Sequence, residues 1–162
     1  MSLFYITLTV HILAAAVWIG GMLFLSLVAV PALRGEDPQT RAHLFTVIGR
    51  QFRWVAWGSI AILISTGLLN LLHFGVGPDD LAQSSFWSTQ FGSRLAFKAI
   101  LITLMLILSA VHDFVLGPRS TALSRTGDPA RAAAYRRRIS WMARISVVLA
   151  ILVVWASVGL AH

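Results

Sequence analysis

Four long apolar segments separated by polar connectors dominate the hydropathy pattern of the chain. They cover residues of about 3–33, 55–73, 95–116 and 139–160. A helix needs about 20 mostly apolar residues to cross a hydrocarbon core about 30 Å thick, and all four segments qualify. The first is longer than the core and must tilt or project. The pattern therefore predicts an all-α integral membrane four-helix bundle, folded as a single transmembrane domain over residues 1–162.

Proline and glycine mark the expected ends of these helices. Asp37-Pro38 and Asp128-Pro129 each offer an N-cap followed by proline at the first helical position. The second and fourth helices are therefore predicted to begin ahead of their apolar parts. Gly77-Pro78 and Gly117-Pro118 are predicted to end the second and third helices. A search for internal duplication of a two-helix unit gives no convincing match in the sequence.

Composition supports a membrane class. Of 162 residues, 57% are hydrophobic and 12% are charged, and cysteine is absent. Soluble domains carry roughly 25% charged residues, so a cytosolic enzyme, a disordered chain and a nucleic-acid module are excluded as classes. Without cysteine there are no disulfides, thiolate metal sites or iron–sulfur clusters.

The net charge of +7 is concentrated in two connectors. Residues 34–53 hold four arginines and residues 117–138 hold six, whereas the connector between the second and third spans holds only Arg94. The positive-inside rule then places both termini on the periplasmic or extracellular side of the inner (plasma) membrane. The run Arg136-Arg137-Arg138 is interpreted as a topology anchor on anionic lipid. The lipid bilayer is thus the expected partner, and nucleic acid is not.

Ionisable side chains inside the predicted spans are costly, so each needs a physical reason. Placed by depth at about 1.5 Å per residue, they form two clusters. The outer cluster comprises His11, His73, Lys98 and the terminal His162. The inner cluster comprises His112, Asp113, Arg53, His43 and Arg144.

Helical spacing also aligns polar residues on three helix faces that we expect to look into the bundle. On the first helix the face comprises His11, Trp18 and Met22, with Ala14, Ala15, Gly20 and Gly21 allowing close approach of a neighbour. On the second it comprises Ser59, Thr66, Asn70 and His73. On the third it comprises Lys98, Met105, Ser109 and His112.

Histidines on facing membrane helices suit copper or haem iron, and methionine thioethers favour Cu(I). The candidate metal ligands are His11, His73, Met22 and Met105. The candidate cofactor-binding residues are His11, Lys98, His112 and Asn70. Each also has a structural interpretation: an imidazole that bonds a carbonyl or hydroxyl, a lysine that extends to the headgroups, a methionine that packs. No catalytic residue is predicted, because no triad, phosphate loop or carboxylate pair is present.

The segment Thr66-Gly67-Leu68-Leu69-Asn70, followed by Gly92, Leu95 and Lys98, resembles the copper resistance protein D (CopD) domain. His11 with Trp18-Ile19-Gly20-Gly21, and the stretch from His112-Asp113-Phe114 to Gly117-Pro118-Arg119, are similar to that family too. A more distant resemblance is to the HemJ-type membrane protoporphyrinogen oxidases, thought to bind haem b. It rests on His11, Lys98 and His112.

The CopD resemblance implies copper binding or transport at the inner membrane, with a periplasmic copper-binding protein as a partner. Many members have eight helices, so a homodimer of this four-helix chain would restore that number. Two alternatives stay open at this point. One is a haem-b redox protein, for which Lys98 would meet a carboxylate of the cofactor. The other is a non-catalytic assembly subunit of a membrane complex.

Overall fold

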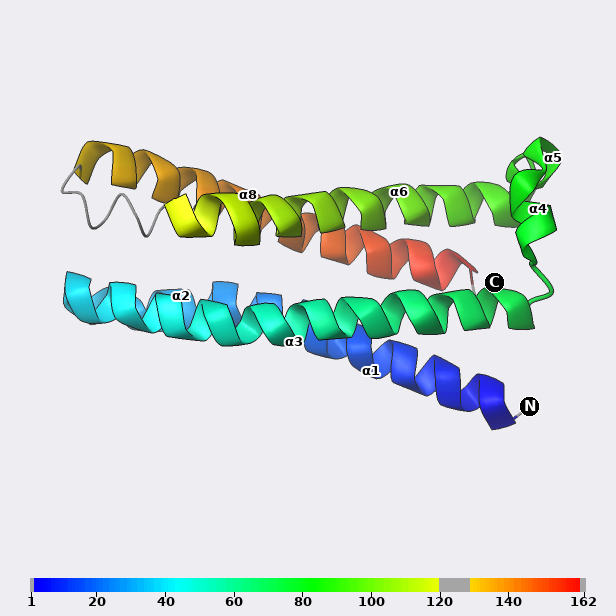
Figure 1. Ribbon diagram of the computed structural model, residues 1–162, viewed down its shortest axis with the longest axis horizontal. Coiled ribbons are helices and arrows are strands. Elements are labelled where there is room, and N and C mark those ends of the chain that lie inside the picture. The colour runs from blue at the N-terminus through cyan, green and yellow to red at the C-terminus, as the bar shows by residue number, and fades with distance from the viewer. Residues whose placement is uncertain (1, 120–128, 161–162) are drawn as a thin grey trace. The chain divides into compact units, whose positions relative to one another are not determined.

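The computed structural model describes residues 2–119 and 129–160, which are helical almost throughout and contain no strand (Figure 1). Four helices in these ranges are long and apolar enough to cross a membrane. Their bounds are Leu3–Gly35, Gln39–His73, Gln90–Arg119 and Arg137–Val158. The predicted all-α membrane class is therefore confirmed. The chain divides into two compact units, Met1–Ser84 and Ser85–His162, and its folding as one domain and one bundle stays a prediction.

The first unit begins with a helix that passes through a proline without ending. It consists of α1 (Ser2–Phe24), the π-helical turn η1 (Leu25–Ala29), α2 (Val30–Ala32) and the 3₁₀ turn η2 (Leu33–Gly35). In the π turn the amide of Val30 donates to the carbonyl of Leu25, five residues back. Proline inside a helix crowds the preceding turn, and this wider turn ends two residues before Pro31.

The second long helix of this unit is α3 (Pro38–His73). The Asp37 carboxylate caps it by accepting hydrogen bonds from the amides of Gln39 and Thr40, each at 3.0 Å. This confirms the N-cap predicted at Asp37-Pro38. Hydrogen bonds from Thr40, first from its side chain and then from its backbone, lower the pKa of Asp37 below its ordinary value of 3.8.

The end of α3 differs from the prediction. The helix ends at His73 and the chain turns through Gly75, whose φ of +77° is the left-handed conformation that glycine adopts without strain. Gly77-Pro78 therefore does not end this helix. Gly77 instead precedes α4 (Pro78–Ala82), and its amide donates to the Asp80 carboxylate at 2.8 Å.

The second unit follows the short helix α5 (Ser84–Trp87), which crosses the boundary between the units. It contains α6 (Gln90–Ala110), the π turn η3 (Val111–Leu116) and α8 (Pro129–Leu160). The third span continues through Gly117 and Pro118 to Arg119, so the predicted helix end at Gly117-Pro118 is wrong. As in the first unit, a π turn ends two residues before the proline. The other predicted cap, Asp128, lies outside the described residues.

Each unit is a pair of packed helices, α1 with α3 and α6 with α8 (Figure 1). The buried residues of α1 are Thr7, Ala14 and Trp18, whose spacing puts them on one face. Most large apolar side chains elsewhere on the four helices are exposed. Such outward apolar surface is expected where the surroundings are hydrocarbon.

The two units also share a plan that the sequence comparison had not shown. In both, a π turn precedes a proline, Pro31 or Pro118, and a second long helix follows. These prolines are 87 positions apart, and the same offset relates the buried Trp18 to the buried Met105. It also relates His11 to Lys98, so the two ionisable residues occupy corresponding positions on α1 and α6.

Candidate functional site

Polar side chains join α1 to α3 along the face that the spacing predicted. His11 Nδ1 lies 2.8 Å from Thr66 Oγ1. One turn away, Thr7 Oγ1 donates to Asn70 Oδ1 at 2.7 Å, and both residues are buried. Thr7 precedes His11 by four residues on α1, whereas its partner Asn70 follows Thr66 by four residues on α3. This opposite order is expected for antiparallel helices. The contacts are possible because both helices carry polar groups at i and i+4.

The Thr66 hydroxyl favours one tautomer of His11. This hydroxyl has one proton, which it donates to the carbonyl of Ile62 at 2.7 Å. Its oxygen then accepts a hydrogen bond from His11 Nδ1. With the hydroxyl proton directed to the Ile62 carbonyl, the matching neutral tautomer of His11 has its hydrogen on Nδ1 and its lone pair on Nε2. Gly67 lies beside the ring, since a Cβ built there would be 3.5 Å from His11 Cε1.

His73 occupies the end of the same helix face. Its ring stacks on Phe4, with centroids 4.3 Å apart and an angle of 10° between the planes. His73 is exposed, whereas His11 is half-buried. His73 lies seven residues beyond Thr66, so the two imidazoles are about 10 Å apart along the helix axes. They do not share a single ion in this arrangement, because each ligand nitrogen lies about 2 Å from its metal.

A neighbouring aromatic ring lies close against the first helix at Gly21. A Cβ at this position would lie 2.8 Å from Cζ of Phe52, inside the ring's contact distance. Gly20 has nothing within 4 Å. The sequence predicted that both Gly20 and Gly21 allow close approach of a neighbouring helix. In the structure only Gly21 of these two lies against a neighbouring side chain. Met22 is half-buried and about 16 Å along α1 from His11.

In the second unit, Lys98 is half-buried and Met105 is completely buried on α6. A fully buried thioether has packing as its evident role. The remaining candidate, His112, lies in the π turn η3 and its Nδ1 is 2.9 Å from Asp113 Oδ1. Their side chains are 41% and 18% exposed. The structure thus pairs two members of the predicted inner cluster.

Among residues 2–119 and 129–160, no group of three or more His, Asp or Glu side chains is arranged to hold a metal ion. The assignments of His11, His73, Met22 and Met105 as metal ligands, and of Asn70, Lys98 and His112 as cofactor-binding residues, stay predictions. Sequence reasoning missed Thr7 and the orienting role of Thr66. The sequence contains the pattern that would have identified them, because Thr7 precedes His11 by four residues and Thr66 precedes Asn70 by four, which puts each pair on one helix face.

Four long apolar helices, with polar contacts between the first two, define a multi-pass membrane protein. Comparison with known proteins identifies its family. Residues 46–160 match the family described as Copper resistance protein D. This is most of the chain, and the protein therefore belongs to the CopD family. The match includes Thr66, Asn70, Lys98 and His112, while His11 lies before it.

Three relatives align with the chain. An uncharacterised protein of Aquifex aeolicus (strain VF5) is 27% identical over 93% of this chain and 90% of its own length. Inner membrane protein YebZ of Escherichia coli (strain K12) is 28% identical over 68% of this chain. Copper transport protein CutJ of Bacillus subtilis (strain 168) is 29% identical over 72% of this chain. These results support an inner-membrane, multi-pass protein.

The relatives differ in size. The aligned part of this chain spans 34% of YebZ and 20% of CutJ, so both are much longer proteins. The Aquifex relative has nearly the same extent as this chain. No solved structure matches the chain.

Proposed function

We propose that this protein binds copper ions in the membrane and takes part in their transport, and that His11 is its principal copper ligand. Membership of the CopD family and the similarity to a relative named as a copper transport protein support the copper assignment. The hydrogen bond between His11 and Thr66 carries the choice of residue. It orients an imidazole within an apolar span and puts the lone pair on Nε2.

A neutral imidazole is a good ligand for copper. Metal-binding histidines usually donate their other ring N–H to an oxygen, which holds the ring in place and increases its basicity. Thr66 supplies that oxygen here. Its own proton is directed to a backbone carbonyl, so the hydroxyl has a defined orientation.

His73 acts in this proposal as a separate ligand ahead of His11, not as a partner on the same ion. It is exposed at the end of α3, where an ion arriving from the membrane surface meets it first. Thr7 and Asn70 lie between the two imidazoles. Successive weak sites suit transport, because an ion has to leave each site as well as enter it. Met22 continues the series farther along α1.

YebZ and CutJ are longer than this chain, so this chain would need additional subunits to match them in size. We infer that further helices come from a second copy of this chain, and that a periplasmic copper-binding protein delivers the ion. A haem role has no such support, since the family description and the names of these relatives refer to copper or to the membrane and not to haem.

Copper accumulation in cells that express the full chain tests the proposal. His11→Ala is expected to reduce copper accumulation strongly, and His11→Ala with His73→Ala to abolish the copper-dependent part. His43→Ala is the matched control, because His43 is exposed on α3 outside the polar face. Equal membrane levels and helical content of the variants are checked first. Unchanged accumulation in the double variant would reject the proposed function.

A further inference from the structure

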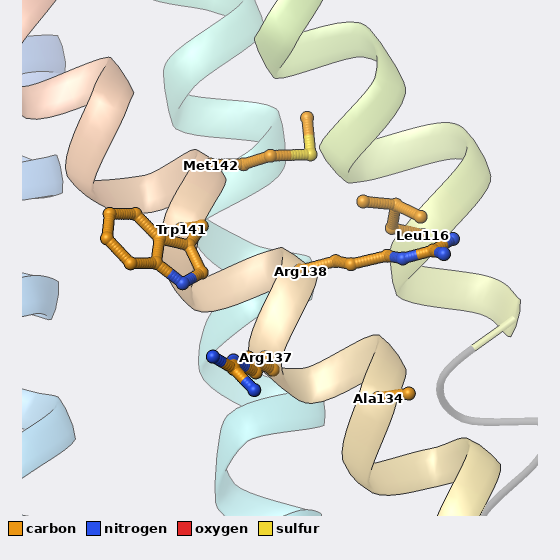
Figure 2. Close-up of a pocket in the computed structure, with 6 residues that line it drawn as sticks. All are labelled: Leu116, Ala134, Arg137, Arg138, Trp141 and Met142. Atoms are coloured by element: carbon orange, nitrogen blue, oxygen red, sulfur yellow. The ribbon is translucent and has the colours of Figure 1, made fainter.

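A groove with a volume of about 540 Å³ lies between the end of η3 and α8 in the second unit (Figure 2). It is lined by Leu116, Ala134, Arg137, Arg138, Trp141 and Met142. Figure 2 shows the Arg138 side chain extending from α8 toward Leu116 on the neighbouring helix. Pockets of a few hundred Å³ hold small organic ligands, so the groove has room for part of a lipid.

The lining changes from charged to apolar along α8. Arg137 and Arg138 directly precede the apolar segment of α8 that begins at Ile139, so their guanidinium groups are expected at the level of the lipid headgroups. Trp141 and Met142 follow one turn later, on the membrane side of the arginines. Leu116 is buried and supplies an apolar wall. The groove thus matches a molecule with a charged end and a hydrocarbon end.

The positive charge of α8 indicates that the charged end of the bound molecule is negative. Helix α8 contains five arginines and no aspartate or glutamate. The guanidinium of Arg144 also lies 5.2 Å from the ring centroid of Trp141, which adds positive charge beside the groove. Arginine binds phosphate through paired hydrogen bonds. An anionic headgroup therefore complements this surface, and a cationic or neutral ligand does not.

We propose that this groove binds an anionic phospholipid, with its phosphate on Arg138, an acyl chain along Leu116 and Met142, and Arg137 adding positive charge from the adjacent face of α8. The exposed tryptophan supports a lipid occupant, because indole rings concentrate at the border of headgroups and hydrocarbon. Ala134 supports it too, since it lines the groove one turn before Arg138 and its short side chain leaves room there. The site is independent of His11 and of copper binding.

Native mass spectrometry of the full chain in detergent tests the site, with phosphatidylglycerol and phosphatidylcholine of identical acyl chains as probes. Phosphatidylglycerol is expected to stay bound where phosphatidylcholine does not. Arg137→Gln with Arg138→Gln should reduce its retention about ten- to thirtyfold. The matched control is Arg34→Gln with Arg50→Gln, which removes the same two charges from exposed positions in the first unit. It should retain the lipid.

A second variant tests the groove apart from the charges. Ala134→Phe keeps every arginine but fills the cavity, and it should reduce retention of phosphatidylglycerol as well. Equal retention of both lipids, an unchanged Arg137→Gln, Arg138→Gln variant or an equal loss in the control would overturn the proposal. Full displacement by millimolar inorganic phosphate would also overturn it, because it would show that the acyl chain contributes nothing.

Discussion

The hydrogen bond from His11 to Thr66 leads to a specific prediction about copper affinity. Thr66→Val keeps the shape of a buried side chain and replaces its hydroxyl with a methyl group. The 2.8 Å contact to His11 Nδ1 is then lost, together with the 2.7 Å bond to the Ile62 carbonyl. That carbonyl belongs to the interior of α3, so its helical bond remains. The change therefore affects the imidazole more than the fold.

The expected effect follows from two estimates. A neutral hydrogen bond contributes about 0.5–1.5 kcal/mol, which corresponds to roughly two- to twelvefold in an equilibrium constant. Removing the group that orients a metal-binding histidine typically costs 10- to 100-fold in metal affinity. The second range includes the effect on tautomer and ring basicity. We therefore expect Thr66→Val to weaken copper binding by about tenfold or more.

Competition with a chromophoric Cu(I) chelator measures this on protein purified in detergent. Thr66→Ser is the matched control, because it keeps the hydroxyl, and its affinity should stay close to that of the native chain. The ¹⁵N resonances of the His11 ring give a readout without copper: Nδ1 should be protonated in the native chain, and Thr66→Val should lose this preference. An unchanged affinity and an unchanged tautomer in Thr66→Val would refute the reasoning.

Two further predictions concern the fold. Gly21→Ala should unfold at a lower temperature than Gly20→Ala in circular dichroism, because its Cβ meets Phe52 and overpacking typically costs about 1–3 kcal/mol; equal midpoints would contradict the close contact. The lowered pKa of Asp37 means that its cap contributes fully above pH 3.8 and is lost as the pH falls through the folded value. Protection of the Thr40 amide from exchange, relative to the unfolded rate at the same pH, should therefore fall in acid, and Asp37→Asn should remove most of that dependence.

Much of the fold was accessible from the sequence because a bilayer imposes simple requirements. A spanning segment has to satisfy its own backbone hydrogen bonds and be apolar over about 20 residues. All four spans were therefore predicted, as was the cap at Asp37-Pro38. The end of the third helix was not. Glycine followed by proline commonly stops a helix, but the π turn before Pro118 allows this one to continue to Arg119.

The candidate site was predictable only as a set of helix faces. Residue spacing placed Thr66, Asn70 and His73 on one face of α3, and the structure buries the first two. Spacing does not say which residue of α1 lies opposite each of them. The observed register pairs His11 with Thr66 and leaves His73 two turns away, on Phe4. His112 likewise lies in a π turn, whose extra residue rotates the positions that follow, and an ideal helix does not reproduce this.

The sequence by itself determined the environment of this protein, its four apolar spans and the face of each helix that carries polar groups. These features follow from the amino-acid composition and from the spacing of apolar and polar residues, which are local properties of the chain. The tertiary structure decided which polar groups meet, that the His11 ring faces the Thr66 hydroxyl, and that Gly21, not Gly20, lies against a neighbouring ring. Those outcomes depend on the axial register of two packed helices. Register is a property of the contact between them and is not written in either helix alone.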